Sequence, residues 1–229
     1  MKYLSLPDKK VYHLSFYLAM EEYVARSMPP DDFFFLWQVE PTVIYGRNQV
    51  VENEVNMDYC REHGIEVVRR KSGGGCVYAD RDNLMLSFVT TEENVGFAFN
   101  RFMGMVLLVL RKMGIEATGT AHNDILIGNR KVCGTACYHV AGRSIVHSTM
   151  LYDTNMEHIT QAITPSREKL QKRGIESVRQ RITLLKDHTT LTLDEIKSLI
   201  RTTLCDGELV LSADDVAEIE KLAIENRKS

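Results

Sequence analysis

Three consecutive glycines, Gly73, Gly74 and Gly75, lie between two short runs rich in β-branched and aromatic residues. Glycine loses the most backbone entropy on folding, so such a run is unfavourable inside a helix or a strand. It is useful in a loop where successive N–H groups point inward and bind an anion. Three cations, Arg69, Arg70 and Lys71, and then Ser72 precede the glycines. The segment predicts a phosphate- or carboxylate-binding loop, with a glycine-rich hairpin turn and solvated charges as the ordinary alternative.

Two common nucleotide-binding motifs are excluded. The glycines are not followed by the Gly-Lys-Ser/Thr of a Walker A loop. The G-x-G-x-x-G fingerprint of a dinucleotide-binding fold is also missing from this segment. Any phosphate bound here must therefore be held in a different way.

The composition is that of an ordinary soluble protein. Of 229 residues, 44% are hydrophobic and 26% are charged, and the net charge is −3, which gives no general attraction to nucleic acid or membrane. The longest apolar run, 105–110, is far shorter than a membrane span. Five cysteines without zinc-ribbon spacing indicate free thiols in a reducing cytosol. We expect a cytoplasmic protein.

The hydrophobic pattern predicts an α+β fold. A helix is expected around 14–28, a short helix at 55–63 closed by Gly64, and a long helix ending at Gly114. Thr192 and Ser212 open two late helices through capping boxes. Strands are expected as a pair within 31–45 broken at Pro41, as two strands within 77–89, and at 116–119, 123–127, 131–139 and 144–152. We expect one domain over 1–229, with a central mixed or antiparallel sheet flanked by helices.

Several stretches, in order, resemble the lipoate–protein ligase A family. The stretch from Arg69 to Tyr78 looks like the lipoyl-binding loop of that family. The other matching stretches are Tyr17-Leu-Ala-Met-Glu-Glu22, Thr42-Val-Ile-Tyr-Gly-Arg-Asn-Gln49, Asn123-Asp124, Arg130-Lys-Val-Cys-Gly-Thr-Ala136, His147-Ser-Thr-Met-Leu151 and Lys172-Arg-Gly-Ile-Glu-Ser-Val-Arg-Gln-Arg181. The resemblance runs from about residue 10 to 190 and implies the catalytic fold shared by lipoate and biotin ligases, which is related to class II aminoacyl-tRNA synthetases.

The resemblance also implies a reaction in two steps. Lipoate would attack ATP, with Mg²⁺, to give lipoyl-adenylate and pyrophosphate. A lysine of an apo lipoyl domain would then take the lipoyl group and release AMP. The expected acceptors are the lipoyl domains of 2-oxoacid dehydrogenase acyltransferase subunits and the glycine-cleavage H protein.

Many bacterial members continue into a small C-terminal domain that this sequence does not contain. A naturally short ligase, a ligase whose accessory domain is a separate polypeptide, and a shortened sequence all remain open.

Lys131 is the expected catalytic residue. It begins a predicted strand, where alternation places it on one side with Cys133, Thr135 and Cys137. A lysine supplies a compact cation for an α-phosphate and for a carboxylate that is becoming an acyl-adenylate. A solvated charge at the edge of a sheet is the ordinary alternative.

The other expected site residues come from the resemblance. Asp124 is expected to bind adenylate or Mg²⁺, although Asn and Asp are also common in turns. Arg179 and Arg181 belong to a basic segment, 165–186, which would close over phosphates or meet an acidic acceptor, or would be a solvated helical face. The residues expected to bind lipoate or adenylate are Arg70, Ser72, Gly73, Gly74, Gly75, Cys76, Val77, Tyr78, Asn123, Asp124, Gly134, Thr135, Ala136, His147 and Thr149.

The sequence departs from the family pattern near the lipoyl pocket. Val146 and Ser148 stand where many members carry His and Gly, and Ala79 stands where His is common. His147 alternates with Ile145, Thr149 and Leu151, so a hydrogen-bonded core histidine is the ordinary alternative for it. These departures put the substrate preference, lipoate or octanoate, in question.

Two rival functions remain. Octanoyl and lipoyl transferases of the same superfamily use a thiol and no ATP, and Cys76, Cys133 and Cys137 are cysteines near the expected site. In one such group the cysteine lies just before the strand that Asn123 opens here, and 119–122 contains none. This favours the ligase. A protein that binds lipoate or adenylate without catalysis is the second rival, and Lys131 and Arg70 argue against it.

Overall fold

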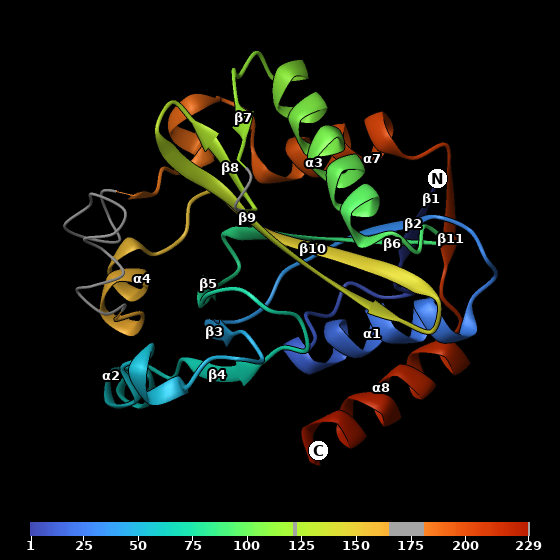
Figure 1. Ribbon diagram of the computed structural model, residues 1–229, viewed down its shortest axis with the longest axis horizontal. Helices are drawn as coiled ribbons and strands as arrows, with labels where there is room; N and C mark the ends of the chain where they lie inside the picture. Colours follow the sequence, from blue (N-terminus) through green and yellow to red (C-terminus); the bar gives the residue numbers. More distant parts are fainter. Residues whose placement is uncertain (121–122, 165–180, 229) are drawn as a thin grey trace.

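The computed structural model describes residues 1–120, 123–164 and 181–228 (Figure 1). Two β-sheets and a set of helices make up this part of the chain. The elements in chain order are β1 (Lys2–Ser5), α1 (Leu14–Ser27), β2 (Phe33–Trp37), β3 (Thr42–Tyr45), η1 (Val51–Asn53), α2 (Met57–Glu62), β4 (Glu66–Arg69), β5 (Val77–Ala79), β6 (Asn83–Thr90), α3 (Val95–Lys112), β7 (Thr118–Gly119), β8 (Asp124–Ile127), β9 (Arg130–Val140), β10 (Arg143–Leu151), α4 (Met156–Ala162), η2 (Leu185–His188), α7 (Leu193–Leu204), β11 (Gly207–Val210) and α8 (Ala213–Lys228).

The large sheet has eight strands in the order β11-β1-β2-β6-β10-β9-β8-β7. β1 is parallel to both of its neighbours, and the pairs from β2 to β7 are antiparallel. A second sheet has three strands in the order β4-β3-β5, with β3 parallel to β4 and antiparallel to β5. The expected mixed sheet is therefore confirmed.

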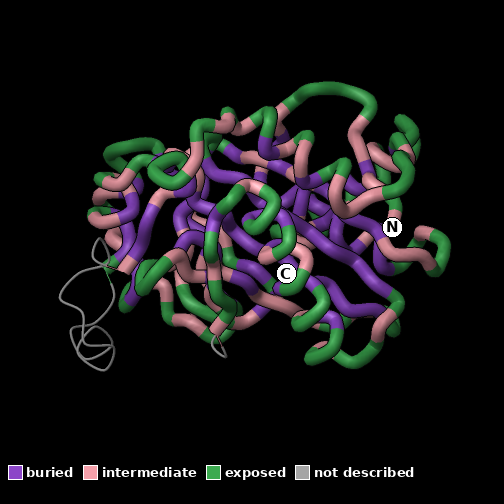
Figure 2. Tube along the Cα trace, turned by 90° about the horizontal axis from the view of Figure 1, so that it is seen from above, coloured by how far each residue is buried: buried purple, intermediate pink, exposed green. Residues whose placement is uncertain are grey.

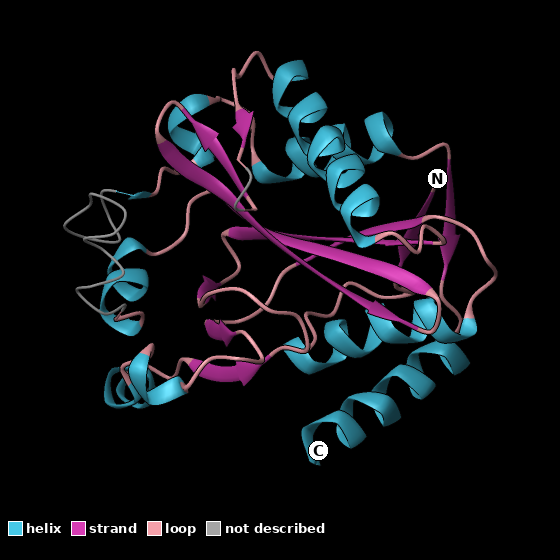
Figure 3. Ribbon diagram, in the orientation of Figure 1, coloured by secondary structure: helices cyan, strands magenta, loops and turns pink. Residues whose placement is uncertain are grey.

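Helices cover both faces of the large sheet (Figures 1 and 3). α3 and α7 pack on one face around Phe34, Phe102 and Val106. α1 packs on the other face around Phe33 and Phe35, and α8 packs on α1. The three consecutive phenylalanines of β2 thus pack into the cores on both faces of the sheet, as a continuous apolar strand predicts. The buried positions run through the middle of the fold, with exposed positions at its rim (Figure 2).

The small sheet has its own apolar cluster with α2 and α4. Val43 of β3, Cys60 of α2, Tyr78 of β5 and Ile159 of α4 are all buried there. Gly64 ends α2 with φ +63°, the left-handed conformation expected of a C-cap glycine. This sheet places its loops beside the α1 face of the large sheet.

Some strand predictions were wrong in their pairing. β2 and β3 lie in different sheets, so Pro41 separates two sheets and not two strands of one pair. The two strands expected within 77–89 are confirmed as β5 and β6, which belong to different sheets. The short strands β1 and β11 were not predicted, because four residues each give too little alternation. The capping boxes at Thr192 and Ser212 are confirmed.

None of the helices in the described residues has the length and hydropathy needed to cross a lipid bilayer.

Candidate active site

The glycine loop, residues 70–76, crosses the carboxyl end of β3. β4 enters the loop on one side of β3, and β5 leaves it on the other side. The loop rests on the turn that follows β3, where the N–H of Arg47 donates to the carbonyl oxygen of Ser72 at 3.1 Å. A Cβ at Gly46 would overlap the carbonyl oxygen of Gly74. Gly46, which the sequence did not single out, therefore makes room for the loop.

The backbone of the loop has the character of an anion site. Gly74 has φ +94°, which side chains disfavour, and Gly74 and Gly75 are both exposed. Among the described residues, the N–H groups of Gly73, Gly74 and Gly75 donate to no protein acceptor. Free N–H groups on an exposed glycine turn suit an anionic ligand.

Arg70 has a different position from the expected one. Its guanidinium is buried and donates to the carbonyl oxygens of Ile44 (3.0 Å), Gly73 (2.7 Å) and Gly75 (2.8 Å). Its Nε also donates to Ser72 Oγ at 3.0 Å. Burial lowers the pKa of Arg70 to about 10, which leaves it charged near neutral pH. Arg70 thus holds the loop together from inside, and its expected contact with lipoate or adenylate stays a prediction.

Lys131 lies in an ion-pair cluster with Asp124 and Arg181. Lys131 Nζ is 2.7 Å from Asp124 Oδ1, and Arg181 Nη2 is 2.6 Å from Asp124 Oδ2. The Lys131 side chain is 18% exposed, so it is not a solvated edge charge. Burial lowers the pKa of Lys131, partly offset by Asp124. Burial raises the pKa of Asp124, but the two cations outweigh it and lower that pKa below its usual value.

The side of the sheet on which Lys131 lies was predicted wrongly. Leu126 of β8 pairs with Lys131 and Ile125 pairs with Cys133, so Val132 is an extra residue that makes a β-bulge. The bulge places Lys131 Nζ directly over Gly134. A Cβ on residue 134 would overlap this ammonium group.

Thr135 lies on the opposite face, and its Oγ1 contacts Met103 Sδ of α3 at 3.7 Å. Cys133 and Cys137 also pack in the α3 cluster. The side chain of Thr135 is therefore not part of the Lys131 site, which corrects its predicted role.

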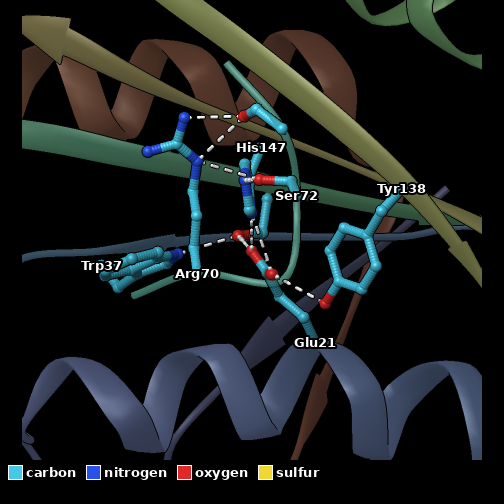
Figure 4. A network of polar contacts seen from close by, with 8 residues as sticks. Glu21, Trp37, Arg70, Ser72, Tyr138 and His147 are labelled. Atoms are coloured by element: carbon cyan, nitrogen blue, oxygen red, sulfur yellow. Dashed lines mark hydrogen bonds and ion pairs between the residues drawn. The ribbon is translucent and has the colours of Figure 1, made fainter. Parts of the chain in front are cut away.

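His147 connects the glycine loop to α1 (Figure 4). His147 Nε2 lies 2.7 Å from Ser72 Oγ, and His147 Nδ1 lies 3.0 Å from Glu21 Oε2. All three residues are buried. On β10, Thr149 follows two residues after His147 on the same face and pairs with Gly134. The glycine loop and the Lys131 cluster therefore lie on one face of the sheet, over His147 and Thr149, which are about 7 Å apart along β10.

Of the remaining predicted residues, Ala136 lies on this face of the sheet, and Asn123 and Tyr78 lie elsewhere. Ala136 pairs with His147 and shares its face. Asn123 is exposed with φ +71° and accepts a hydrogen bond from the Thr135 N–H at 2.8 Å. Tyr78 is buried, and its ring stacks on His158 of α4 with 5.8 Å between the ring centroids. The side chain of Tyr78 therefore packs in the small-sheet cluster, which does not support its predicted contact with lipoate.

Val77 packs against the α1 core. Arg179 lies outside the described residues, as does all of the basic segment from 165 to 180.

The cysteines near the site have poor properties for a nucleophile. Burial raises the pKa of Cys76 to about 11, despite the opposing effects of Arg70 and of a hydrogen bond to Gln49. Burial raises the pKa of Cys133 to about 11 as well, and that of Cys137 in the same direction. A thiol must lose its proton to attack an acyl group. The described thiols therefore do not favour the transferase mechanism.

Solved structures with the same fold bind the substrates expected here. A Thermoplasma acidophilum protein solved with bound lipoic acid has a TM-score of 0.81 and 25% identity, over 98% of this chain and 94% of that one. A lipoate-protein ligase A bound with ATP has a TM-score of 0.80 and 25% identity, over 98% of this chain and 93% of that one. The fold is that of the biotin/lipoate ligase superfamily.

The sequence comparisons define the family. The model of the lipoyl protein ligase A/B catalytic domain matches residues 13–205, and the chain belongs to this family. Lipoate–protein ligase 1 of Staphylococcus aureus is 34% identical over 97% of this chain and 70% of its own length. The lipoate-protein ligase LplJ of Bacillus subtilis is 36% identical over 79% of this chain. The matched region spans only 56% of the Bacillus protein.

Proposed function

We propose that this chain activates lipoate with ATP and transfers the lipoyl group to a lysine of an apo lipoyl domain. The observation that carries the proposal is the position of Lys131. Its ammonium group is held 2.7 Å from Asp124 Oδ1, on the same sheet face as the glycine loop. We further propose that residues 1–229 act as a single catalytic domain, since the two sheets contribute to one site.

In the first step, a carboxylate oxygen of lipoate attacks the α-phosphorus of ATP. The bond from the α-phosphorus to the bridging oxygen breaks, and pyrophosphate leaves. Negative charge gathers on the phosphoryl oxygens, where Lys131 supplies a fixed cation. A preorganised donor of this kind contributes about 2.7–4 kcal/mol to such a transition state. The free N–H groups of the glycine loop bind an anionic group of the substrate or of the adenylate.

In the second step, the amine of the acceptor lysine attacks the lipoyl carbonyl carbon. The bond between that carbon and the phosphate oxygen breaks, AMP leaves, and the nitrogen loses a proton to form the amide. Lys131 faces the same mixed anhydride and stabilises the departing phosphate. Gly134 keeps this position open, because a Cβ there would overlap the Lys131 ammonium group.

The residues at Asp124 do not fit a protein-held Mg²⁺. Both carboxylate oxygens already accept from cations, and a divalent ion there would face Lys131 and Arg181 at contact distance. No group of three metal-ligating side chains occurs in the described ranges. The role of Asp124 is to hold Lys131, and Mg²⁺ would accompany ATP, since it commonly binds through substrate phosphates.

For the acceptor we propose a folded apo lipoyl domain, from a 2-oxoacid dehydrogenase acyltransferase subunit or from the glycine-cleavage H protein. A related Thermoplasma acidophilum system is described as a bi-partite lipoate protein ligase and its E2 lipoyl domain. A second polypeptide is therefore a reasonable partner for the transfer step of this chain.

Acylation of an apo lipoyl domain tests the proposal. The chain is incubated with lipoate, ATP and Mg²⁺, and pyrophosphate release and the mass of the acceptor are followed separately. We expect both signals to depend on ATP and lipoate. Transfer from an octanoyl-carrier protein without ATP would establish the transferase instead, and lipoate binding with neither signal would establish a binding protein.

A further inference from the structure

Two consecutive acidic residues of α1, Glu21 and Glu22, are both buried, at 0% and 4% exposure. Neighbouring residues on a helix point about 100° apart, so both are rarely covered at once. Here the large sheet covers one side of α1 and α8 covers another. A buried carboxylate is costly unless hydrogen-bond donors surround it. Each glutamate therefore needs a set of donors, and both sets lead to the glycine loop.

Glu21 accepts from three donors. Ser87 Oγ donates at 2.6 Å, and the Tyr138 hydroxyl donates at 3.3 Å. His147 Nδ1 is the third, at 3.0 Å, and the other ring nitrogen of His147 meets Ser72 Oγ at 2.7 Å. Ser72 is the residue directly before the three glycines. Glu21 thus reaches the loop through one imidazole ring.

The directions of these hydrogen bonds follow from the carboxylate end. A carboxylate only accepts, so His147 Nδ1 donates to Glu21. In a neutral imidazole the other nitrogen then accepts, so Ser72 Oγ donates to His147 Nε2 and accepts from Arg70 Nε. At the other end, Trp37 Nε1 donates to Ser87 at 2.8 Å, so the Ser87 hydroxyl donates to Glu21. Each donor in this series of hydrogen bonds, from Trp37 to Arg70, meets an acceptor.

Glu22 reaches the loop directly. Its Oε2 accepts from Lys71 Nζ at 2.8 Å and from Asn226 Nδ2 of α8 at 2.9 Å. Lys71 Nζ also donates to Asn226 Oδ1 at 3.0 Å, which closes a triangle. Burial raises the pKa of Glu22, but the hydrogen bonds from Lys71 and Asn226 and the charge of Lys71 outweigh it and lower that pKa.

We propose that Glu21 and Glu22 are positioning residues for the glycine loop. They hold Ser72 and Lys71, the two residues directly before Gly73, and so fix the direction in which the free N–H groups point before any substrate arrives. Asn226 extends this support to α8. The effect of the two glutamates on catalysis rests on the proposed function, whereas their effect on the loop does not.

Trypsin cleavage in the ligand-free protein measures the hold on the loop, because Arg69, Arg70 and Lys71 are cleavage sites next to the glycines. The variants are Glu21→Gln, which offers a donor where the carboxylate accepts, and Glu22→Gln, which removes the charge facing Lys71. Tyr23→Phe is the matched control, because Tyr23 joins α1 to α8 through Asp215 at 2.5 Å without a contact to the loop. Lys71→Met tests the same hold from a half-exposed position if Glu21→Gln does not fold.

We expect cleavage after residues 69–71 to become at least about tenfold faster in the two glutamine variants. In Lys71→Met the same acceleration is expected at the two remaining sites, Arg69 and Arg70. Tyr23→Phe should be cleaved at the wild-type rate. The kcat/KM for lipoate should fall by about 10²-fold in Glu21→Gln, because a reacting group displaced by about 1 Å loses that much. Unchanged cleavage in all loop variants, or equal acceleration in Tyr23→Phe, would overturn the positioning role. If the glutamine variants are cleaved faster while the wild-type protein itself releases no pyrophosphate with lipoate and ATP, the positioning role is supported and the proposed function is rejected.

Discussion

Lys131 Nζ lies 2.7 Å from Asp124 Oδ1, and a β-bulge opposite Leu126 and Ile125 puts it there. Without the extra residue, Lys131 would point toward α3 together with Cys133 and Thr135. With it, the ammonium group lies over Gly134, on the side of the glycine loop. The one-residue shift in register between β8 and β9 therefore decides whether Lys131 belongs to the site.

Lys131→Met should reduce pyrophosphate release with lipoate and ATP by about 10²–10³-fold, because it removes a fixed charge from the developing oxyanion. Asp124 keeps Arg181 as a partner, so the loss in unfolding free energy should stay below about 3 kcal/mol. Lys197→Met, at a half-buried lysine on α7 paired with Asp194, is the control and should keep full activity. Normal turnover by a folded Lys131→Met protein would remove Lys131 from the site.

The pH dependence of adenylate formation should reflect the environment of Lys131. Lysine serves here as a cation, so activity is present below its pKa and is lost as the pH rises through it. Burial lowers that pKa, and the charge of Arg181 lowers it further, so the alkaline loss should occur below the ordinary value for lysine. Arg181→Gln removes the second effect and should move the alkaline limb to higher pH. An unchanged limb in the variant would contradict this assignment.

Much of the site follows from local sequence, and some of it does not. Three glycines after a serine predict a loop by their backbone chemistry alone. The face of Lys131 could not be predicted, because the bulge depends on the register between β8 and β9. Arg70 could not be assigned either, because its partners include Ile44, which is 26 residues away.

Glu21 and Glu22 were missed as site residues for a similar reason. An acidic pair on a helix usually indicates a solvated face, and the partners of Glu22, Lys71 and Asn226 of α8, lie 49 and 204 residues away in the sequence. Tyr78 and Thr135 were placed in the site because their neighbours in sequence belong to it. The alternation of a strand turns every second side chain to the opposite face.

Gly46→Ala should weaken lipoate binding more than it lowers the melting temperature. A Cβ there overlaps the carbonyl oxygen of Gly74, so the glycine loop must shift. Gly104→Ala is the control, since its Cβ would meet open space on α3 and should stabilise the helix by about 0.5–1 kcal/mol. Titration of lipoate into both variants, together with thermal melting, checks this. Equal lipoate affinity in both variants would show that the position of the loop does not matter for binding.

Gly74→Val should also impair binding of lipoate and adenylate with a smaller effect on stability. Gly74 has φ +94°, and a Cβ there would lie 3.0 Å from Arg70 Nη2. The strain falls on an exposed loop and not on a core. A collapse of the melting temperature with normal binding by the folded fraction would instead mark the loop as structural.

Replacement of Cys76, Cys133 and Cys137 by serine should leave lipoyl transfer measurable and dependent on ATP. Burial raises the pKa of all three thiols, so none is prepared to attack an acyl group. Cys133 is fully buried, so the triple variant should be somewhat less stable. A thioester trapped on one of these residues by mass spectrometry would reverse the choice between ligase and transferase.

Detection of lipoyl-adenylate on the enzyme tests the central claim most directly. The chain is mixed with lipoate, ATP and Mg²⁺ without an acceptor, and the bound products are identified by mass spectrometry, with Lys131→Met in parallel. We predict that lipoyl-adenylate accumulates on the wild-type chain, is absent from the variant, and disappears with release of AMP when an apo lipoyl domain is added. A folded wild-type chain that binds lipoate and ATP and forms no adenylate would contradict the account.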